Sequence, residues 1–231
     1  MIWPYPGVDI YLIYSFLCKL NSAKLLSAML RVQLIKEGIL AGAMIGIAGF
    51  AYLAVGGFYG ALLFSFGLIS IYVYKLKLFT GTAGNFKLNP EGIAALCCVL
   101  ILNIIGTAII SMFARVSPLD IQAKAVAVVN QRLTTGWWQC GLLAILCGFI
   151  VDEAVYAWNS RQNIIPTVFG VCVFVLCGFC QCVADAFYIS TLPLDMLKAD
   201  FGPILAVYLS VVAGNFIGCN IRRFLRLDRQ A

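Results

Sequence analysis

Six long apolar stretches, separated by short polar or charged segments, dominate this sequence. A helix needs about 20 apolar residues to cross the roughly 30 Å hydrocarbon core of a bilayer, and most of the stretches reach that length. Hydrophobic residues make up 62% of the chain and charged residues 11%, which excludes a soluble globular domain. The sequence therefore predicts an all-α membrane protein with six transmembrane helices, at residues 38–58, 61–76, 93–114, 137–158, 166–189 and 201–221.

Two of these stretches contain residues that do not suit a regular helix in lipid. The second is short and runs into residues 78–90, where glycine, asparagine and proline are frequent. The fifth contains Gly178, Gln181 and Asp185 at what would be mid-membrane depth. Non-helical backbone and ionisable groups are tolerated there only where they face protein or a water-filled path. We therefore expect the second and fifth helices to be interrupted and to line a pore.

The distribution of basic residues predicts the orientation of the chain. If both termini are cytoplasmic, most of the 16 Lys and Arg residues lie on the cytoplasmic side, as the positive-inside rule requires. The net charge of +6 then needs no nucleic-acid partner to explain it. No pattern typical of a cleavable signal peptide opens the chain. We predict an amphipathic cytoplasmic segment at 1–36, a membrane domain at 37–221 and a basic cytoplasmic tail at 222–231.

A weak internal repeat relates the two halves of the chain. The sequence from Gly38 to Ala41 is similar to that from Gly141 to Ala144. Asn103-Ile104-Ile105-Gly106 likewise matches Asn215-Phe216-Ile217-Gly218. Each half holds three apolar stretches, and an odd number of spans gives the two halves opposite orientations in the membrane. The repeat therefore predicts an inverted arrangement of three plus three helices.

Several motifs occur in order along the chain: Ala41-Gly42, Ile45-Gly46-Ile47, Phe64-Ser65-Phe66-Gly67-Leu68, Leu78-Phe79-Thr80-Gly81, Leu143-Ala144-Ile145-Leu146-Cys147, Gly178-Phe179 with Val183-Ala184 and Phe187, and Gly214-Asn215-Phe216-Ile217-Gly218. In these motifs the chain resembles the formate/nitrite transporter family, which includes formate, nitrite and hydrosulfide channels. The resemblance implies an aquaporin-like protomer in a homopentamer of a bacterial inner (plasma) membrane. It also implies a transporter of small anions or weak acids, with no enzymatic activity and no cofactor.

Helical spacing groups the candidate pore residues. Phe174, Gly178, Gln181 and Asp185 are spaced so that one face of a continuous fifth helix would carry them all. The resemblance implies an outer constriction at Phe64 and Phe174 and a cytoplasmic constriction at Leu68, Leu78 and Phe79. It places Thr80 on the interrupting loop, as a gate or ligand hydroxyl. Packing in an aromatic core is the alternative explanation for each Phe.

The chain departs from the family at its central site. Gln181 stands where the family has histidine, and the chain contains no histidine, so a histidine proton relay is excluded. Asp185 stands where the family has Asn, and Arg132 where it has Lys. If Asp185 pairs with Arg132, the positive potential that attracts anions is largely cancelled. If burial instead protonates Asp185, this carboxyl could replace the histidine as a proton donor.

Other polar residues leave further alternatives. Asp152, Glu153 and Lys77 are expected to form charge-swapped interhelix pairs or, alternatively, to line an altered conduction path. The 10 cysteines have no metal-site spacing, and an intramembrane thiol enzyme is the least favoured hypothesis. The leading hypothesis is a passive or proton-coupled channel for small monovalent anions or their weak acids, of the formate, nitrite or hydrosulfide class. A channel for a small neutral solute is the alternative, because Gln181 replaces the central histidine.

Overall fold

A computed structural model describes residues 10–225, with side chains described from residue 30 onward. Two compact units can be distinguished, Met1–Lys36 and Glu37–Ala231. In the first unit, the described residues form the N-terminal part of helix α1 (Ile10–Val55). The predicted cytoplasmic segments at the two ends lie partly outside the described residues. The second unit contains the rest of α1. Its other described elements are also helices, joined by short loops: α2 (Gly57–Val73), α3 (Phe79–Ala83), α4 (Pro90–Arg115), α5 (Ile121–Thr135), α6 (Trp137–Arg161), α7 (Ile165–Leu176), α8 (Cys182–Thr191), α9 (Leu194–Ala199), α10 (Phe201–Cys219) and α11 (Ile221–Phe224).

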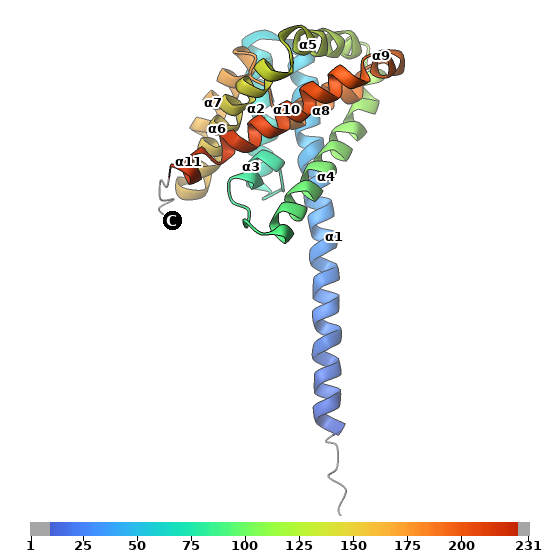
Figure 1. Cartoon of the computed structure of the whole chain (residues 1–231), viewed down its shortest axis with the longest axis vertical. Helices are drawn as coiled ribbons and strands as arrows, with labels where there is room; N and C mark the ends of the chain where they lie inside the picture. Colours follow the sequence, from blue (N-terminus) through green and yellow to red (C-terminus); the bar gives the residue numbers. More distant parts are fainter. Residues whose placement is uncertain (1–9, 226–231) are drawn as a thin grey trace, which may run out of the picture. The chain divides into compact units, whose positions relative to one another are not determined.

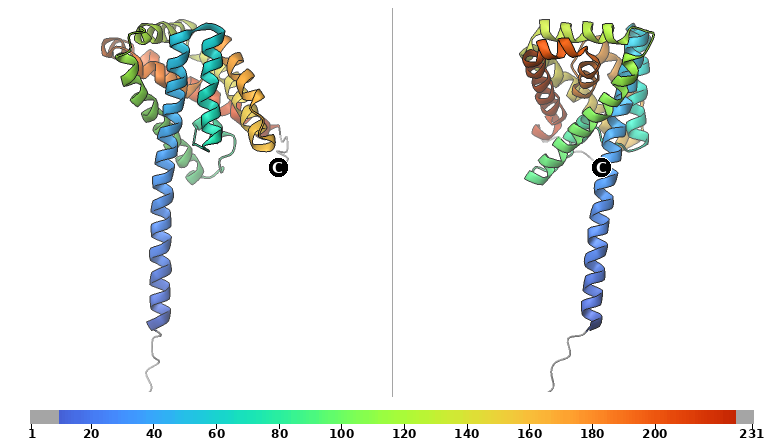
Figure 2. Two further views of the ribbon diagram at one scale, coloured as in Figure 1. Left: turned by 180° about the vertical axis from the view of Figure 1, so that it is seen from behind. Right: turned by 90° about the vertical axis from the view of Figure 1, so that its right-hand side faces the viewer.

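Among the residues that the structure describes, four helical segments are long and apolar enough to cross a membrane: Leu30–Val55 of α1, and α4, α6 and α10. The apolar helices α2 and α7 are shorter. Within the second unit, α6 packs against α10 and α2 packs against α7. The amphipathic helix α5 lies across the end of the bundle at which α1 and α2 join, whereas α3 lies toward the opposite end (Figures 1 and 2). The two shorter apolar helices therefore lie side by side, and α7 also packs against α6.

The two shorter helices continue, after a break, into a second helical piece. α2 ends at Val73, and the five-residue helix α3 follows the break. α7 ends at Leu176, and α8 begins at Cys182. Gly178 lies in this second break with a φ of +71°, a left-handed conformation that favours glycine. Both interruptions that the sequence predicts are therefore present.

The first break is held by Asn103 of α4, whose side chain is fully buried. The Asn103 amide Nδ2 donates to the backbone carbonyls of Gly38 at 2.8 Å and Lys77 at 2.9 Å. Its Oδ1 accepts from the backbone N–H of Phe79 at 2.8 Å. Backbone groups left unpaired in an apolar environment cost several kcal/mol each, so this side chain makes the break tolerable inside the membrane.

The second break is held by the same set of bonds, from Asn215 of α10. The Asn215 Nδ2 donates to the carbonyls of Ala144 at 2.8 Å and Cys180 at 2.9 Å. Its Oδ1 accepts from the N–H of Cys182 at 2.8 Å. Each break is therefore fixed by an asparagine from the long apolar helix that follows it in the chain. In this pattern the counterpart of Gly38 is Ala144, and not Gly141 as the sequence similarity indicates.

Glycines let the long helices approach closely in both halves. A Cβ atom at Gly42 would lie 2.0 Å from the carbonyl oxygen of Asn103, and one at Gly148 would lie 2.4 Å from that of Asn215. Both distances are far below van der Waals contact, so no larger residue fits without moving a backbone. The close approach brings each asparagine within hydrogen-bonding reach of the break.

Candidate permeation site

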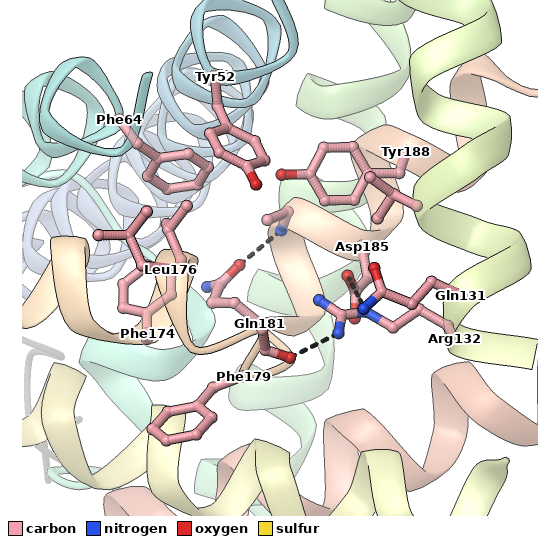
Figure 3. A pocket seen from close by; sticks show the side chains of 14 residues that line it. Tyr52, Phe64, Gln131, Arg132, Phe174, Leu176, Phe179, Gln181, Asp185 and Tyr188 are labelled. Atoms are coloured by element: carbon pink, nitrogen blue, oxygen red, sulfur yellow. Dashed lines mark hydrogen bonds and ion pairs between the residues drawn. The ribbon is translucent and has the colours of Figure 1, made fainter. Parts of the chain in front are cut away.

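A cavity of about 150 Å³ lies beside the break between α7 and α8 (Figure 3). Six residues that the sequence analysis singled out line this cavity: Phe64, Arg132, Phe174, Gly178, Gln181 and Asp185. A bound water needs only about 10–15 Å³ of such volume, so the cavity has room for several waters or one small solute. The remaining lining residues are Tyr52, Val128, Gln131, Val175, Leu176, Phe179, Ala184 and Tyr188.

An aromatic pair forms one wall of the cavity. The rings of Phe64 on α2 and Phe174 on α7 meet edge to face, with centroids 5.7 Å apart and an angle of 87° between the rings. Both side chains are buried. Tyr52 and Tyr188 were not anticipated from the sequence, and their hydroxyl groups point toward each other above the cavity (Figure 3). The signal for Tyr188 was available, because it follows Asp185 by one helical turn and so shares its face.

Gln181 caps the N-terminus of α8. Its side-chain Oε1 accepts a hydrogen bond from the backbone N–H of Ala184. Its Nε2 lies 3.5 Å from Oγ1 of Thr80, the limit of a hydrogen bond. Because the amide oxygen is occupied by the helix terminus, the NH₂ group is the end of the side chain that remains for Thr80 and the cavity.

The prediction that one continuous helical face carries the fifth-span residues is wrong. Phe174 belongs to α7, Asp185 belongs to α8, and Gln181 precedes α8 in extended conformation. The break changes the direction of the chain, so helical spacing does not apply across it. The residues nevertheless meet around the cavity, because the two helical pieces and the break surround it.

Arg132 and Asp185 form a buried but loose ion pair. Nε of Arg132 lies 3.6 Å from Oδ1 of Asp185, and their side chains are 14% and 6% exposed. Arg132 also donates a hydrogen bond of 2.6 Å to the carbonyl of Gly178. Neither carboxylate oxygen of Asp185 accepts a hydrogen bond from the side chains that the structure describes. Burial acts to lower the pKa of Arg132, but the nearby Asp185 carboxylate, with contributions from Cys180 and other polar neighbours, leaves this pKa above its usual value, so Arg132 is charged.

The residues expected at the cytoplasmic constriction lie outside this cavity. Leu68, Leu78, Phe79 and Thr80 are all buried, and none of them lines the cavity. The carbonyl of Thr80 accepts a contact of 3.1 Å from the Cys219 thiol of α10. The α3 segment packs against α4, α6 and α10.

Asp152 and Glu153 of α6 face a different basic residue from Lys77, the partner expected from the sequence. Arg222 in α11 makes a bidentate hydrogen-bonded ion pair with Glu153 and lies 4.0 Å from Asp152. Its guanidinium also lies 4.3 Å above the ring of Tyr156. Lys77 is exposed, and it contributes its backbone carbonyl to the first break instead. The cysteines whose side chains are described are free thiols, and in that part of the chain no metal-binding cluster is found.

Comparisons with known proteins agree with this arrangement. The family model "Formate/nitrite transporter" matches residues 21–222. A solved structure described as "Pentameric formate channel with formate bound" is 21% identical, with a TM-score of 0.69 over 84% of this chain and 95% of that one. Another, an "FNT family ion channel", is 16% identical, with a TM-score of 0.68 over 90% of this chain and 95% of that one. No curated protein sequence matches significantly. The chain is therefore a multi-pass membrane protein that belongs to the formate/nitrite transporter family.

Proposed function

We propose that this protein is a channel for small monovalent anions or their weak acids, of the formate, nitrite or hydrosulfide class, with passive or proton-coupled transport. The cavity beside the second break carries the proposal. It is large enough for such a solute, and Arg132 and the Gln181 amide offer hydrogen-bond donors at its wall. Family membership supports transport, and one of the structural neighbours is described as having formate bound.

In this proposal, two constrictions enclose a polar chamber. The ring pair of Phe64 and Phe174 forms the outer constriction. Leu68, Leu78 and Phe79, whose side chains are all buried, form the cytoplasmic constriction. Gln181, Asp185 and Arg132 line the chamber between the constrictions, and Thr80 belongs to it through its contact with the Gln181 amide. Opening toward the cytoplasm requires movement of the short helix α3, because Phe79 lies in it and Leu78 immediately precedes it.

We further propose an aquaporin-like protomer with six membrane spans in an inverted repeat. The two sets of asparagine hydrogen bonds support this, because each set joins the corresponding helices of its own half. A homopentamer is supported by the pentameric neighbour. The proposed organisation places the amphipathic segment 1–36 and the tail 222–231 in the cytoplasm, on either side of a channel domain at 37–221. The basic residues support this topology and a bacterial inner membrane as the location.

Flux through reconstituted protein tests the proposal. Proteoliposomes should take up formate, nitrite or hydrosulfide faster than empty liposomes. Ala184→Phe places a ring at the cavity wall and should abolish this uptake, whereas Ala123→Phe, at an exposed position on α5, should leave it unchanged. Absence of uptake for all three substrates, or full uptake by Ala184→Phe, would contradict the proposal. Stopped-flow swelling with small uncharged solutes separates it from a neutral-solute channel.

A further inference from the structure

We infer that Tyr52 and Tyr188 select the substrate at the cavity wall, in favour of small oxyanions such as formate or nitrite and against hydrosulfide. The inference rests on the proposed channel function and specifies its substrate class. Tyr52 comes from α1 and Tyr188 from α8, and both line the cavity. Their hydroxyl groups point toward each other (Figure 3). Two O–H groups from separate helices thus face the same space.

The two hydroxyls lack a protein partner on the cavity wall. Tyr188 is only 5% exposed, and buried phenol groups usually have a hydrogen-bond partner. Figure 3 marks no hydrogen bond from either hydroxyl to the other described side chains that line the cavity. Among the described residues, the tyrosine hydroxyls that are unpaired and cut off from any accessible surface belong to Tyr72 and Tyr208. The hydroxyls of Tyr52 and Tyr188 are therefore open to the cavity, where water or a solute can satisfy them.

A small solute can reach these groups, and it meets mainly donors. The cavity lining includes Gln131 of α5, which is exposed, so the cavity reaches the surface of the molecule. The Gln181 amide adds N–H donors, because its oxygen accepts from the helix N-terminus. Asp185 offsets these donors little, since both of its carboxylate oxygens have almost no accessible surface. The wall thus favours a solute with strong acceptors.

Acceptor strength separates oxyanions from hydrosulfide. Formate and nitrite each have two oxygen acceptors, and hydrogen bonds from O–H groups to anionic oxygen are short and strong. Two acceptor atoms can also bridge two donors that come from different helices. Sulfur is a weak acceptor, and hydrosulfide has a single acceptor atom. Protonation does not remove the difference, because formic acid keeps a carbonyl oxygen and hydrogen sulfide has only its sulfur.

Ring packing alone does not require the hydroxyls. Tyr188 packs its ring edge to face against Phe187, with the centroids 5.8 Å apart. A phenylalanine at position 188 can make the same ring contact. Substitution of either tyrosine by phenylalanine therefore removes the donor and keeps the ring, which separates the choice of substrate from packing.

Competition against labelled formate tests the inference. Proteoliposomes take up a trace of labelled formate at fixed pH, and unlabelled formate or hydrosulfide is added separately. Less formate than hydrosulfide should half-inhibit the wild type. In Tyr52→Phe and in Tyr188→Phe, the half-inhibiting concentration of formate should rise about tenfold, as for the loss of a hydrogen bond to a charged group. That of hydrosulfide should change by less than about twofold, because sulfur is a weak acceptor.

Tyr208→Phe is the matched control, because Tyr208 lies on α10 and does not line this cavity. It should leave both concentrations at their wild-type values. An equal rise for both competitors in the cavity variants, or no rise for formate, would overturn the inference. If neither cavity variant folds, the wild type still decides, since stronger inhibition by hydrosulfide than by formate would also overturn it, as would uptake of hydrosulfide alone. Absence of uptake for formate, nitrite and hydrosulfide would contradict the proposed channel function instead.

Discussion

Gln181 in the second break reaches Thr80 in the first, with Nε2 3.5 Å from Oγ1, although the two residues are 101 positions apart in the chain. Both side chains are buried. This contact joins the two interrupted helices at the centre of the protein. It also places an amide, which does not titrate in the physiological range, where the family has an imidazole.

Replacement of Gln181 by His should therefore introduce a pH dependence. A histidine in water has a pKa of about 6.5, so the Gln181→His variant gains a group that titrates near neutral pH. We expect its formate uptake to change between about pH 5.5 and 7.5 when the concentration of undissociated acid is held constant. The wild type should show no such change over this range. Gln162→His, at an exposed position, should behave like the wild type; equal pH profiles in both variants would refute this prediction.

Asn103→Leu should destabilise the protein strongly. The substitution leaves the N–H of Phe79 and the carbonyls of Gly38 and Lys77 without their partner. A buried polar group that loses its partner costs about 1–3 kcal/mol, so the loss should exceed that of one hydrogen bond. Thermal unfolding in detergent, followed by circular dichroism, measures the effect. Asn130→Leu, at an exposed position on α5, should unfold at the wild-type temperature, and an equal shift in both variants would argue against the proposed role of Asn103.

Phe174→Ala should widen the outer constriction. Removal of one ring of the pair with Phe64 leaves a void in the cavity wall, and substrate uptake should rise. A buried Phe→Ala substitution commonly costs about 3–5 kcal/mol, so uptake must be normalised to the amount of folded protein. Phe169→Ala is the matched control, because Phe169 lies on the same helix and is 66% exposed. Unchanged uptake by correctly folded Phe174→Ala would assign this pair to core packing alone.

The ion pair between Arg222 and Glu153 should stabilise the end of α6 against α11. Arg222→Glu replaces attraction by repulsion and should lower the thermal stability. The loss should be about 1.5–3 kcal/mol, as for hydrogen bonds to charged groups. Adding Glu153→Arg should restore part of this loss, whereas Arg161→Glu, at an exposed position, should have little effect. No recovery in the double variant would show that the pair itself contributes nothing.

Asn220→Ala should loosen α3. The Asn220 side chain donates to the carbonyl of Ala83 at 3.0 Å and accepts from Arg223, which in turn donates to the carbonyl of Phe86 at 2.9 Å. Without these links, the amides of residues 79–89 should exchange hydrogen faster, as measured by mass spectrometry. Substrate uptake should rise as well, since Phe79 of the proposed cytoplasmic constriction lies in α3. Asn159→Ala, at an exposed position, serves as the control. Unaltered exchange would mean that α3 is held by packing alone.

The helices and their breaks could be predicted from the sequence because both depend on local composition. A run of apolar residues long enough to cross the bilayer, or a cluster of glycine and proline, is visible within a short window. The residues that line the cavity were harder to predict from the sequence. Tyr52 and Gln131, for example, come from helices whose packing no local pattern determines. The motifs shared with the family located Phe64, Phe174 and Gln181.

Distant polar contacts could not be predicted in the same way. Glu153 is separated from Arg222 by 69 positions, and nothing in the local sequence distinguishes Arg222 from Lys77 as its partner. The sequence similarity around Asn103 and Asn215 corresponds to matching hydrogen bonds in the structure, and it stands out because asparagine is rare among apolar residues. Around Gly38 the register differed, because glycine, leucine and alanine are common in membrane helices and match by chance.

The asparagine braces also bear on how the protein is made. Asn103 follows Phe79 by 24 positions, and Asn215 follows Cys182 by 33. A nascent chain that has just exposed either break therefore cannot lock it, and the partner side chain emerges only with the next apolar helix. Each break can therefore be fixed only after the helix that carries its asparagine has entered the bilayer, and folding should proceed in two steps, first around Asn103 and then around Asn215.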